Sequence, residues 1–350
     1  MRVQVPTQKL LAFQKYIRNN CGAIFLGLVV GTIIGFWVHA PNNGAIVQLQ
    51  SKPLRSPDPE YPLTNPLLGY DNPESTNFGQ LVNFKSKLSK LVDQETVQNN
   101  ASKISIYFRD MNTGHWISIN EDEPYTPASL LKLPIMMAYY RLAETDPKIL
   151  NKEIGFYVKN NLVYKQFINP AQRLQVGKSY TIDELIKNMI IYSDNDSMQL
   201  LFDNFTPNVL SKVFSDMGIF MPTNLGVEDF LSVKNYALFL RVLYGSTYLN
   251  SSYSEKALEL LSKSEFKNGL VSGVPEGVTV AHKFGESGLV DLTTNIIKNR
   301  EFHDCGIVYY PQKPYLLCVM TKGNDLNNLE KSVSNISKFV YDEVKNYQSK

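Results

Sequence analysis

Apolar and polar residues alternate in a strand-like way in two groups of short stretches. These stretches are residues 103–109, 115–119, 277–284, 303–310 and 314–321. Alternation of this kind is typical of strands with one face in a core. The first two stretches flank Asn112-Thr113-Gly114, a turn sequence that predicts a β-hairpin.

Helix-like patterns fill the region between the two groups of strands and flank it. The segment 129–144 is apolar on almost every side, which predicts a helix buried at the centre of the fold. The other predicted helices are residues 76–98, 181–192, 196–205, 231–245, 254–264 and 325–347. This order predicts an α+β fold, in which N- and C-terminal helices flank one antiparallel sheet and an all-helical subdomain is inserted. We expect the functional site in a cleft between the sheet and the subdomain.

The N-terminal part of the chain predicts a membrane anchor. Residues 21–40 contain no charged residue except His39, and twenty such residues can cross a bilayer as a helix. Residues 1–20 carry four basic residues and no acid, so we expect them in the cytoplasm and the rest of the chain outside it. This predicts a single-pass protein of the cell membrane with an extracytoplasmic domain. A cleaved signal peptide is the alternative, because Val38-His39-Ala40 resembles a cleavage site.

A proline-rich stretch separates the predicted anchor from the folded part. Residues 41–75 contain seven prolines, which predicts an extended linker. The apolar groups Tyr61-Pro62-Leu63 and Pro66-Leu67-Leu68 are candidates to dock on the domain surface. The catalytic domain is then expected to cover residues 76–350.

Composition limits the classes of function. Lys and Arg number 35 against 33 Asp and Glu, a balance that argues against nucleic-acid binding. The spacing of three Cys and four His does not resemble a zinc site, so we expect neither a metal nor a cofactor. We also expect a monomeric catalytic domain. Cys305 and Cys318 fall on two adjacent predicted strands, where we expect buried free thiols, with a cross-strand disulfide as the alternative.

The first of three ordered motifs is Ser129-Leu130-Leu131-Lys132, at the start of the buried helix. Residues i and i+3 share a helix face, so the Ser129 hydroxyl and the Lys132 amine should be in contact. A lysine enclosed near other cations loses its charge readily and can act as the base that a serine nucleophile needs. The same spacing recurs at Ser264-Glu265-Phe266-Lys267, but that copy lies at a polar helix end. We therefore assign Ser129 and Lys132 as the catalytic pair.

The second motif, Ser193-Asp194-Asn195, lies between two predicted helices and occurs once. The hydroxyl of Ser193 can relay a proton to a leaving nitrogen, and the amide of Asn195 can hold a substrate carbonyl. Plain helix capping is the alternative, because all three residue types are good N-caps.

The third motif, Lys283-Phe284-Gly285, ends a predicted strand. Lys283 is a candidate to bind a substrate carboxylate, with a solvated edge lysine as the alternative. Gly285 would let the backbone approach a ligand closely. The N–H of Glu286 is a candidate donor to an oxyanion, together with the N–H groups at the start of the buried helix.

The order Ser-x-x-Lys, Ser-Asp-Asn, Lys-x-Gly resembles that of the class A β-lactamase and penicillin-binding-protein superfamily, over roughly residues 80–350. The resemblance implies that Ser129 is the acylated nucleophile and Lys132 its base. It also implies that Ser193 relays protons, that Asn195 binds the substrate amide and that Lys283 binds its carboxylate. The implied substrate is a β-lactam or a D-alanyl peptide of the cell wall.

Two departures from the superfamily pattern matter for function. Phe284 stands where the family carries a threonine or serine hydroxyl, and we expect its ring to narrow or fill the cleft. The family's Glu-x-x-Leu-Asn loop, whose glutamate activates the deacylating water, has no match in residues 222–230. Glu228 and Asp229 are the acids there, and both are poor candidates. Without this base the protein should acylate and then stall, or pass the acyl group to an amine.

These observations leave three readings of the function. The first is an anchored serine hydrolase that works through an acyl-serine intermediate. The second is a penicillin-binding-type DD-peptidase without efficient deacylation. The third is a non-catalytic protein that binds cell-wall peptide. Phe284 slightly favours the third reading, whereas the intact serines, lysines and asparagine of the three motifs favour catalysis.

Overall fold

The computed structural model describes residues 60–65, 78–98, 101–157, 167–205, 208–222, 229–290 and 297–346, together with Lys15. Residues 1–52 and 53–350 form separate units, and the fold described below belongs to the second. The predicted membrane helix at 21–40 and most of the linker lie outside the described residues. Within the described part of the chain, no helix combines the length and the apolar character needed to span a bilayer.

One five-stranded antiparallel sheet forms the centre of the domain, in the order β2-β1-β7-β6-β5. Its strands are β1 (Lys103–Asp110), β2 (Trp116–Ile119), β5 (Val280–Val290), β6 (Ile297–Val308) and β7 (Tyr315–Gly323). The predicted α+β fold and its antiparallel sheet are confirmed. β5 and β6 are longer than predicted, because their ladder continues through polar pairs such as Ser287 and Glu301 that interrupt the alternation.

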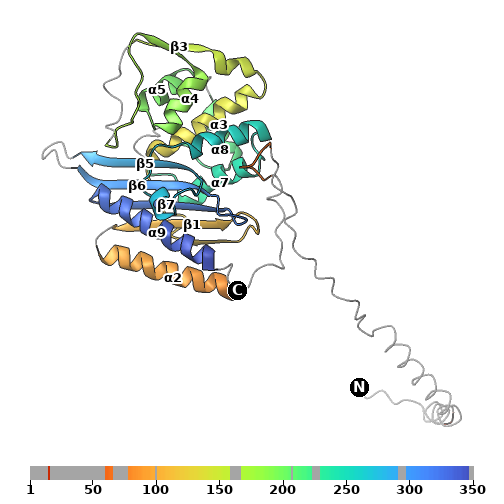
Figure 1. The fold of residues 1–350 in the computed structure, drawn as a ribbon, viewed down its shortest axis with the longest axis vertical. Coiled ribbons are helices and arrows are strands. Elements are labelled where there is room, and N and C mark those ends of the chain that lie inside the picture. The colour runs from red at the N-terminus through yellow and green to blue at the C-terminus, as the bar shows by residue number, and fades with distance from the viewer. Residues whose placement is uncertain are drawn as a thin grey trace, which may run out of the picture. The chain divides into compact units, whose positions relative to one another are not determined.

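Helices cover both faces of this sheet (Figure 1). The terminal helices α2 (Phe78–Val97) and α9 (Leu326–Asn346) pack on one face and close an apolar core that includes Phe84, Leu88 and Val333. On the other face, α7 (Val233–Tyr244) and α8 (Ser251–Ser262) contact the sheet. The remaining inserted helices extend the same core: α3 (Lys132–Ala143), α4 (Ile182–Ile191), α5 (Asn195–Asp203) and α6 (Val209–Asp216). Alternate strand residues thus enter two separate cores.

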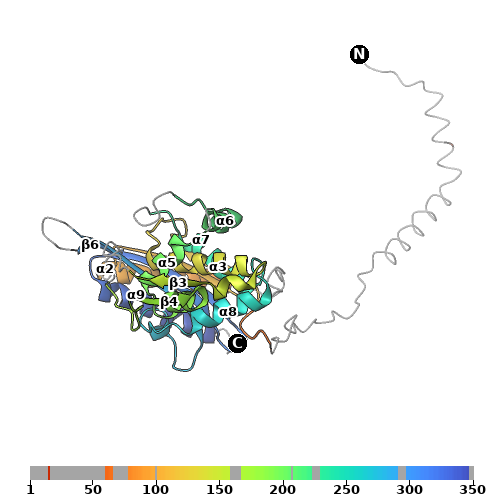
Figure 2. The same cartoon turned by 90° about the horizontal axis from the view of Figure 1, so that it is seen from above.

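The inserted subdomain is built around α3, whose side chains are buried on almost every side as predicted. This helix contacts α4, α5, α6 and α8, and α6 and α8 lie on opposite sides of it (Figure 2). The prediction that the subdomain is all-helical is wrong in one respect. A two-stranded sheet joins β3 (Glu153–Phe156) to β4 (Lys178–Thr181). Four-residue strands are too short to show a clear alternation.

Part of the proline-rich stretch docks on the domain. The Leu63 N–H donates to the two carboxylate oxygens of Glu255 at 2.9 and 3.1 Å. The Leu63 carbonyl accepts a hydrogen bond from the Tyr309 hydroxyl at 2.9 Å. The predicted docking of Tyr61-Pro62-Leu63 is confirmed, whereas Pro66-Leu67-Leu68 lies outside the described residues.

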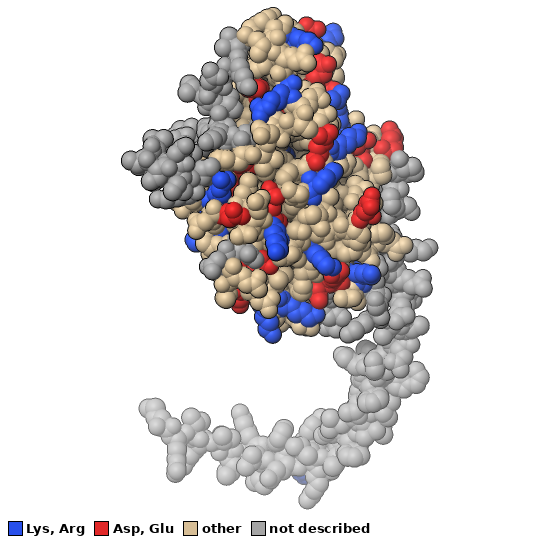
Figure 3. Space-filling view, turned by 60° about the vertical axis from the view of Figure 1, so that its left-hand side comes forward, with Lys and Arg blue, Asp and Glu red and all other residues tan. Residues whose placement is uncertain are grey.

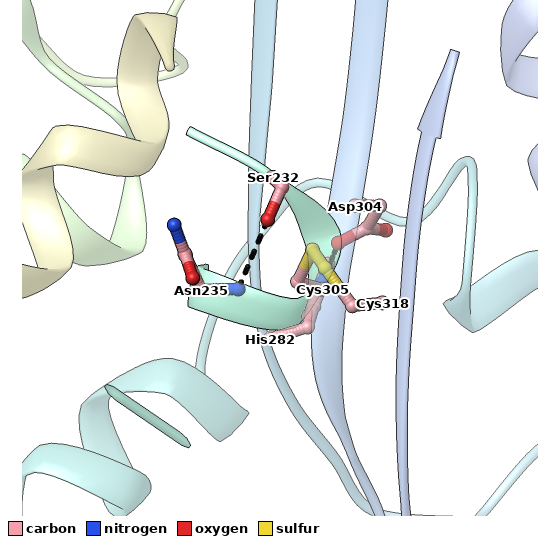
Figure 4. Close-up of a disulfide and its surroundings, with 6 residues drawn as sticks. All are labelled: Ser232, Asn235, His282, Asp304, Cys305 and Cys318. Carbon is pink, nitrogen blue, oxygen red and sulfur yellow. Dashed lines mark hydrogen bonds and ion pairs between the residues drawn. A yellow bond between two sulfur atoms is a disulfide. The ribbon is translucent and has the colours of Figure 1, made fainter. Parts of the chain in front are cut away.

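Cys305 and Cys318 form a disulfide, so the expectation of free thiols is wrong (Figure 4). The two residues are direct partners in the β6–β7 ladder, and both side chains are fully buried on the face toward the inserted helices. Alternation along each strand does not reveal this register, which decides whether two cysteines lie opposite each other. Beside the disulfide, His282 Nδ1 lies 2.8 Å from Asp304 Oδ1.

Charged side chains of both signs are interspersed over the face shown in Figure 3. Along the helices of the domain, several charged residues form ion pairs four residues apart, such as Lys212 and Asp216 on α6 at 2.8 Å. Lys338 and Asp342 on α9 repeat this arrangement at 3.0 Å. Positive and negative charges are therefore mixed on this side of the domain.

Candidate active site

Ser129 lies in a short 3₁₀ turn, Ala128–Leu131, that runs directly into α3. Lys132 is the first residue of α3, and its Nζ lies 2.9 Å from Ser129 Oγ. The contact predicted from the i, i+3 spacing is confirmed. Ala128 has a φ of 50°, a conformation that costs a non-glycine residue about 1–3 kcal/mol. Strained backbone of this kind collects at functional sites, where the rest of the fold holds it in place.

The Lys132 side chain is fully buried. Its Nζ contacts four oxygens: Ser129 Oγ at 2.9 Å, Ser193 O at 2.6 Å, Ser193 Oγ at 3.0 Å and Asn195 Oδ1 at 2.7 Å. Burial lowers the pKa of Lys132 to about 7, against the opposing charges of Asp194 and Glu286. A substantial fraction of this lysine is therefore uncharged at neutral pH.

The partners of Lys132 decide what an uncharged amine would do there. A neutral amine has two N–H donors and one lone pair. The Ser193 carbonyl and Asn195 Oδ1 can only accept hydrogen bonds, so they take the two N–H groups. The lone pair then remains for a hydroxyl proton, either that of Ser129 at 2.9 Å or that of Ser193 at 3.0 Å. A base beside a serine nucleophile needs this arrangement.

Ser193-Asp194-Asn195 joins α4 to α5, and its three residues make different contacts. Asp194 is the N-cap of α5, and its Oδ2 accepts from the backbone N–H and the hydroxyl of Ser197 at 2.7 and 2.6 Å. Ser193 and Asn195, on either side, reach Lys132. Ser193 has a φ of 56°, a second strained position at this site. Capping therefore accounts for Asp194 but not for its two neighbours.

Lys283 on β5 joins the same cluster from the sheet. Its Nζ donates to Ser193 Oγ at 3.0 Å and to the Phe284 carbonyl at 2.9 Å. The side chain is fully buried, so Lys283 is not a solvated edge lysine. Burial, and next the positive charge of Lys132, hold the pKa of Lys283 well below its ordinary value. Binding of a substrate carboxylate by Lys283 stays a prediction, because the Nζ already has protein partners.

Phe284 places its ring against the lysine. The ring centroid lies 4.1 Å from Lys283 Nζ, and the ring stacks on Phe266 with centroids 4.0 Å apart. Phe284 is buried, in the core shared with α2 and α9. An aromatic ring thus covers the ammonium group beside the position where the superfamily carries a hydroxyl.

The structure gives a different reason for glycine at position 285 from the one that the sequence predicted. A Cβ at this position would lie 3.1 Å from both the Leu130 nitrogen and the Pro127 oxygen. Glycine therefore lets β5 approach the turn that carries Ser129. The close neighbour seen here is protein backbone, whereas the sequence predicted a ligand.

The Glu286 side chain makes contacts that the sequence did not predict. Its Oε1 accepts from the backbone N–H groups of Phe167 and Ile168 at 2.8 and 3.1 Å. Its Oε2 is buried and has no hydrogen-bond partner among the described residues. Burial raises the pKa of Glu286, while the two N–H groups and the charges of Lys132 and Arg300 oppose that rise. The predicted oxyanion role of the Glu286 N–H stays a prediction.

The acids of residues 222–230 stay poor candidates for deacylation. Glu228 lies outside the described residues. Asp229 accepts hydrogen bonds from Thr126 Oγ1 at 2.6 Å and from Lys322 Nζ at 2.5 Å. Burial acts to raise the pKa of Asp229, but these two bonds leave it below the ordinary value, which makes Asp229 a weak base. No cluster of three or more potential metal ligands occurs in the part of the chain that the structure describes.

Comparison with known proteins identifies the family of the chain. A model of the beta-lactamase enzyme family matches residues 83–344. Beta-lactamase ROB-1 of Haemophilus influenzae is 32% identical over 104 residues, which are 30% of this chain and 32% of that protein. ROB-1 of Mannheimia haemolytica gives the same figures. The chain is thus aligned with about a third of the length of these relatives.

Solved structures share the fold at low sequence identity. PBP-A matches with a TM-score of 0.63 and 20% identity, covering 76% of this chain and 97% of PBP-A. One PBP-A variant is described as an acyl-enzyme complex with penicillin G. A class A beta-lactamase from Mycobacterium abscessus matches with a TM-score of 0.61 and 20% identity, covering 75% of this chain and 99% of that one. The family match over most of the domain, with a shared fold, shows that this chain belongs to the beta-lactamase enzyme family.

Proposed function

We propose that this protein is a serine hydrolase that opens an amide or lactam bond through an acyl-serine intermediate on Ser129. The observation that carries the proposal is the position of Lys132 Nζ, which contacts the hydroxyls of both Ser129 and Ser193. One buried amine with a lowered pKa can therefore accept the proton of the nucleophile and pass a proton toward the leaving group.

Acylation would proceed in two linked proton transfers. Ser129 Oγ attacks the carbonyl carbon while its proton moves to Lys132 Nζ. As the C–N bond of the tetrahedral intermediate breaks, Ser193 Oγ gives its proton to the leaving nitrogen, and Lys132 returns a proton to Ser193. Lys283, which donates to Ser193 Oγ, orients that hydroxyl. Water later attacks the ester carbon and releases the acid, which restores the Ser129 hydroxyl.

The substrate class we propose is a β-lactam or a D-alanyl-type amide, as in the family to which the chain belongs. Slow deacylation, as in a penicillin-binding-type DD-peptidase, is the second candidate. It is supported by Asp229, whose carboxylate is already bound by Thr126 and Lys322 and is poorly suited to activate water. A non-catalytic peptide-binding role has less support, because it gives no reason for a fully buried lysine between two serine hydroxyls.

Acylation can be tested by intact-mass spectrometry of the full-length protein with penicillin G and with a chromogenic cephalosporin. We expect one covalent adduct in the wild type and none in Ser129→Ala. Rapid loss of the adduct with turnover would indicate a β-lactamase, and a long-lived adduct a penicillin-binding-type enzyme. Ser272→Ala, which alters a surface hydroxyl bonded to Ser334, is the matched control. Equal labelling of wild type and Ser129→Ala would contradict the proposal.

We also propose that residues 21–40 anchor the domain outside the cytoplasm. The proposal is supported by the apolar composition of this segment and by the basic residues before it. Protease added to intact cells should remove the domain while a cytoplasmic marker survives. Protection of the domain until the cells are lysed would contradict this location.

A further inference from the structure

The charge distribution around Ser129 does not suit a substrate carboxylate. Lys283, the cation expected to bind such a group, is fully buried, and its Nζ is bonded to Ser193 and the Phe284 carbonyl. The Phe284 ring covers it at 4.1 Å and supplies no hydroxyl. Lys132, the other cation, is also fully buried and occupied by four oxygens. Both lysines are thus enclosed by the protein and already bonded to its oxygens.

A carboxylate of the protein, that of Glu286 on β5, adds a negative charge near these lysines. Glu286 is one residue beyond Gly285, where a β-carbon would be crowded at 3.1 Å by the turn that carries Ser129. The negative charge of Glu286 acts on both Lys132 and Lys283. A substrate carboxylate placed beside these lysines would therefore be repelled by Glu286 while it gains little from either cation.

The position of the Glu286 carboxylate is fixed from the opposite side. The N–H groups of Phe167 and Ile168 hold Oε1, and Arg300 lies over the Phe167 ring at 4.8 Å from its centroid. Burial raises the pKa of Glu286, and the two N–H groups oppose that rise, because hydrogen bonds to a carboxylate favour its ionised form. They also leave Oε2 buried without a hydrogen-bond partner among the described residues. A buried carboxylate oxygen in that state is a strong acceptor for a cationic or N–H group brought by a substrate.

From these contacts we propose that Glu286 makes the site select acyl donors that are neutral or cationic beside the scissile bond and discriminate against those with a carboxylate there. The proposal rests on the acyl-serine chemistry proposed above and specifies the substrate charge for it. Glu286 acts on the charge of the substrate and carries no covalent step.

Three compounds with one scaffold test this selection: penicillin G, its methyl ester and its diethylaminoethyl ester. They place a negative, a neutral and a positive group at the same position. The second-order rate of adduct formation is measured by intact mass for the full-length wild type. We expect both esters to acylate at least about tenfold faster than the acid, the cationic ester fastest, since one like charge at close range in a partly buried site has an effect of this order.

Glu286→Gln removes the charge and keeps the shape and the acceptor oxygen for the N–H groups of Phe167 and Ile168. We expect it to lower the ester-to-acid rate ratio by about tenfold or more, mainly by faster reaction of the acid. Glu276→Gln, at an exposed position, changes the net charge equally and should leave the ratio unchanged. Glu286→Ser, with a melting curve for each variant, keeps the test valid if the glutamine variant folds poorly.

The outcomes separate the two proposals. Adducts that form at equal rates from all three compounds, or a ratio that Glu286→Gln leaves unchanged, would overturn the charge selection and leave the acyl-serine chemistry standing. A change in adduct lifetime without a change in the ratio would also overturn it, because Glu286 would then act on the deacylating water. Absence of any adduct with every compound in every variant would overturn the acyl-serine proposal for lactams and the selection with it.

Discussion

Two copies of the spacing Ser-x-x-Lys occur in this chain, and the fold buries the lysine of one and exposes the lysine of the other. Lys132 starts a buried helix, is fully enclosed, and contacts the hydroxyl of Ser129 at 2.9 Å. Lys267 lies exposed beyond the end of α8, and its Nζ bonds the Ser264 carbonyl at 2.7 Å. The identical spacing therefore brings a lysine to a hydroxyl in one copy and to a carbonyl in the other.

Burial accounts for the chemical difference between the two copies. Enclosure by the sheet and the inserted helices lowers the pKa of Lys132 to about 7, so its amine can accept a proton at neutral pH. Ser193 and Asn195 from the α4–α5 connection then complete its contacts. Near Lys267 the carbonyl partner can neither donate nor lose a proton. The motif acquires chemistry from the elements that enclose it, more than from its own residues.

The largest expected effect comes from removing each lysine in turn. Lys132→Ala should slow acylation of Ser129 by about 10²–10⁴-fold, the range typical of a lost general base. Lys267→Ala should leave the rate unchanged, because its exposed Nζ contacts only a backbone carbonyl among the partners described. Pre-steady-state adduct formation by mass spectrometry measures both. Similar losses of rate in the two variants would show that Lys132 is not the specific base for Ser129.

A somewhat smaller effect is expected at Ser193, whose hydroxyl contacts Lys132, and Ser264, the first residue of the second copy, serves as the control. Ser193→Ala should slow acylation by about a hundredfold through loss of the proton relay. Ser193→Gly should slow it equally and serves as the control for strain, because glycine accepts the φ of 56° without cost. Ser264→Ala should have no effect on the rate. If the glycine variant keeps wild-type activity, Ser193 has a backbone role only.

The pH dependence of the acylation rate also distinguishes Lys132 from Lys267. With the pKa of Lys132 lowered to about 7 by burial, the neutral amine is the minor form below that pH. The acylation rate should therefore rise about tenfold per pH unit below pH 7 and level off above it. The profile of Lys267→Ala should match that of the wild type. A rate that is flat across pH 7 would exclude Lys132 as the base.

Much of the site follows from the sequence because local rules suffice for it. The i, i+3 spacing placed Ser129 and Lys132 together, and the all-apolar pattern predicted the buried helix that begins at Lys132. Asp194 also behaves as its N-cap preference predicts. What the sequence left open depends on contacts between distant segments. The Cys305–Cys318 pairing depends on strand register, and the hydrogen bonds from Phe167 and Ile168 to Glu286 join residues more than a hundred positions apart.

The smallest expected effect concerns stability. The pKa of Lys132 is about 7 in the folded protein and near 10.5 when exposed, so between these values the folded state binds fewer protons than the unfolded state. Stability due to this lysine then rises with pH over that window, and the cost of burying its charge is full below pH 7. Lys132→Met should therefore raise the melting temperature by a few degrees near pH 6, with a gain that shrinks toward pH 9. Lys267→Met, at an exposed position, should show no such trend; a pH-independent difference for Lys132→Met would mean that its hydrogen bonds, and not its charge, set the stability of the site.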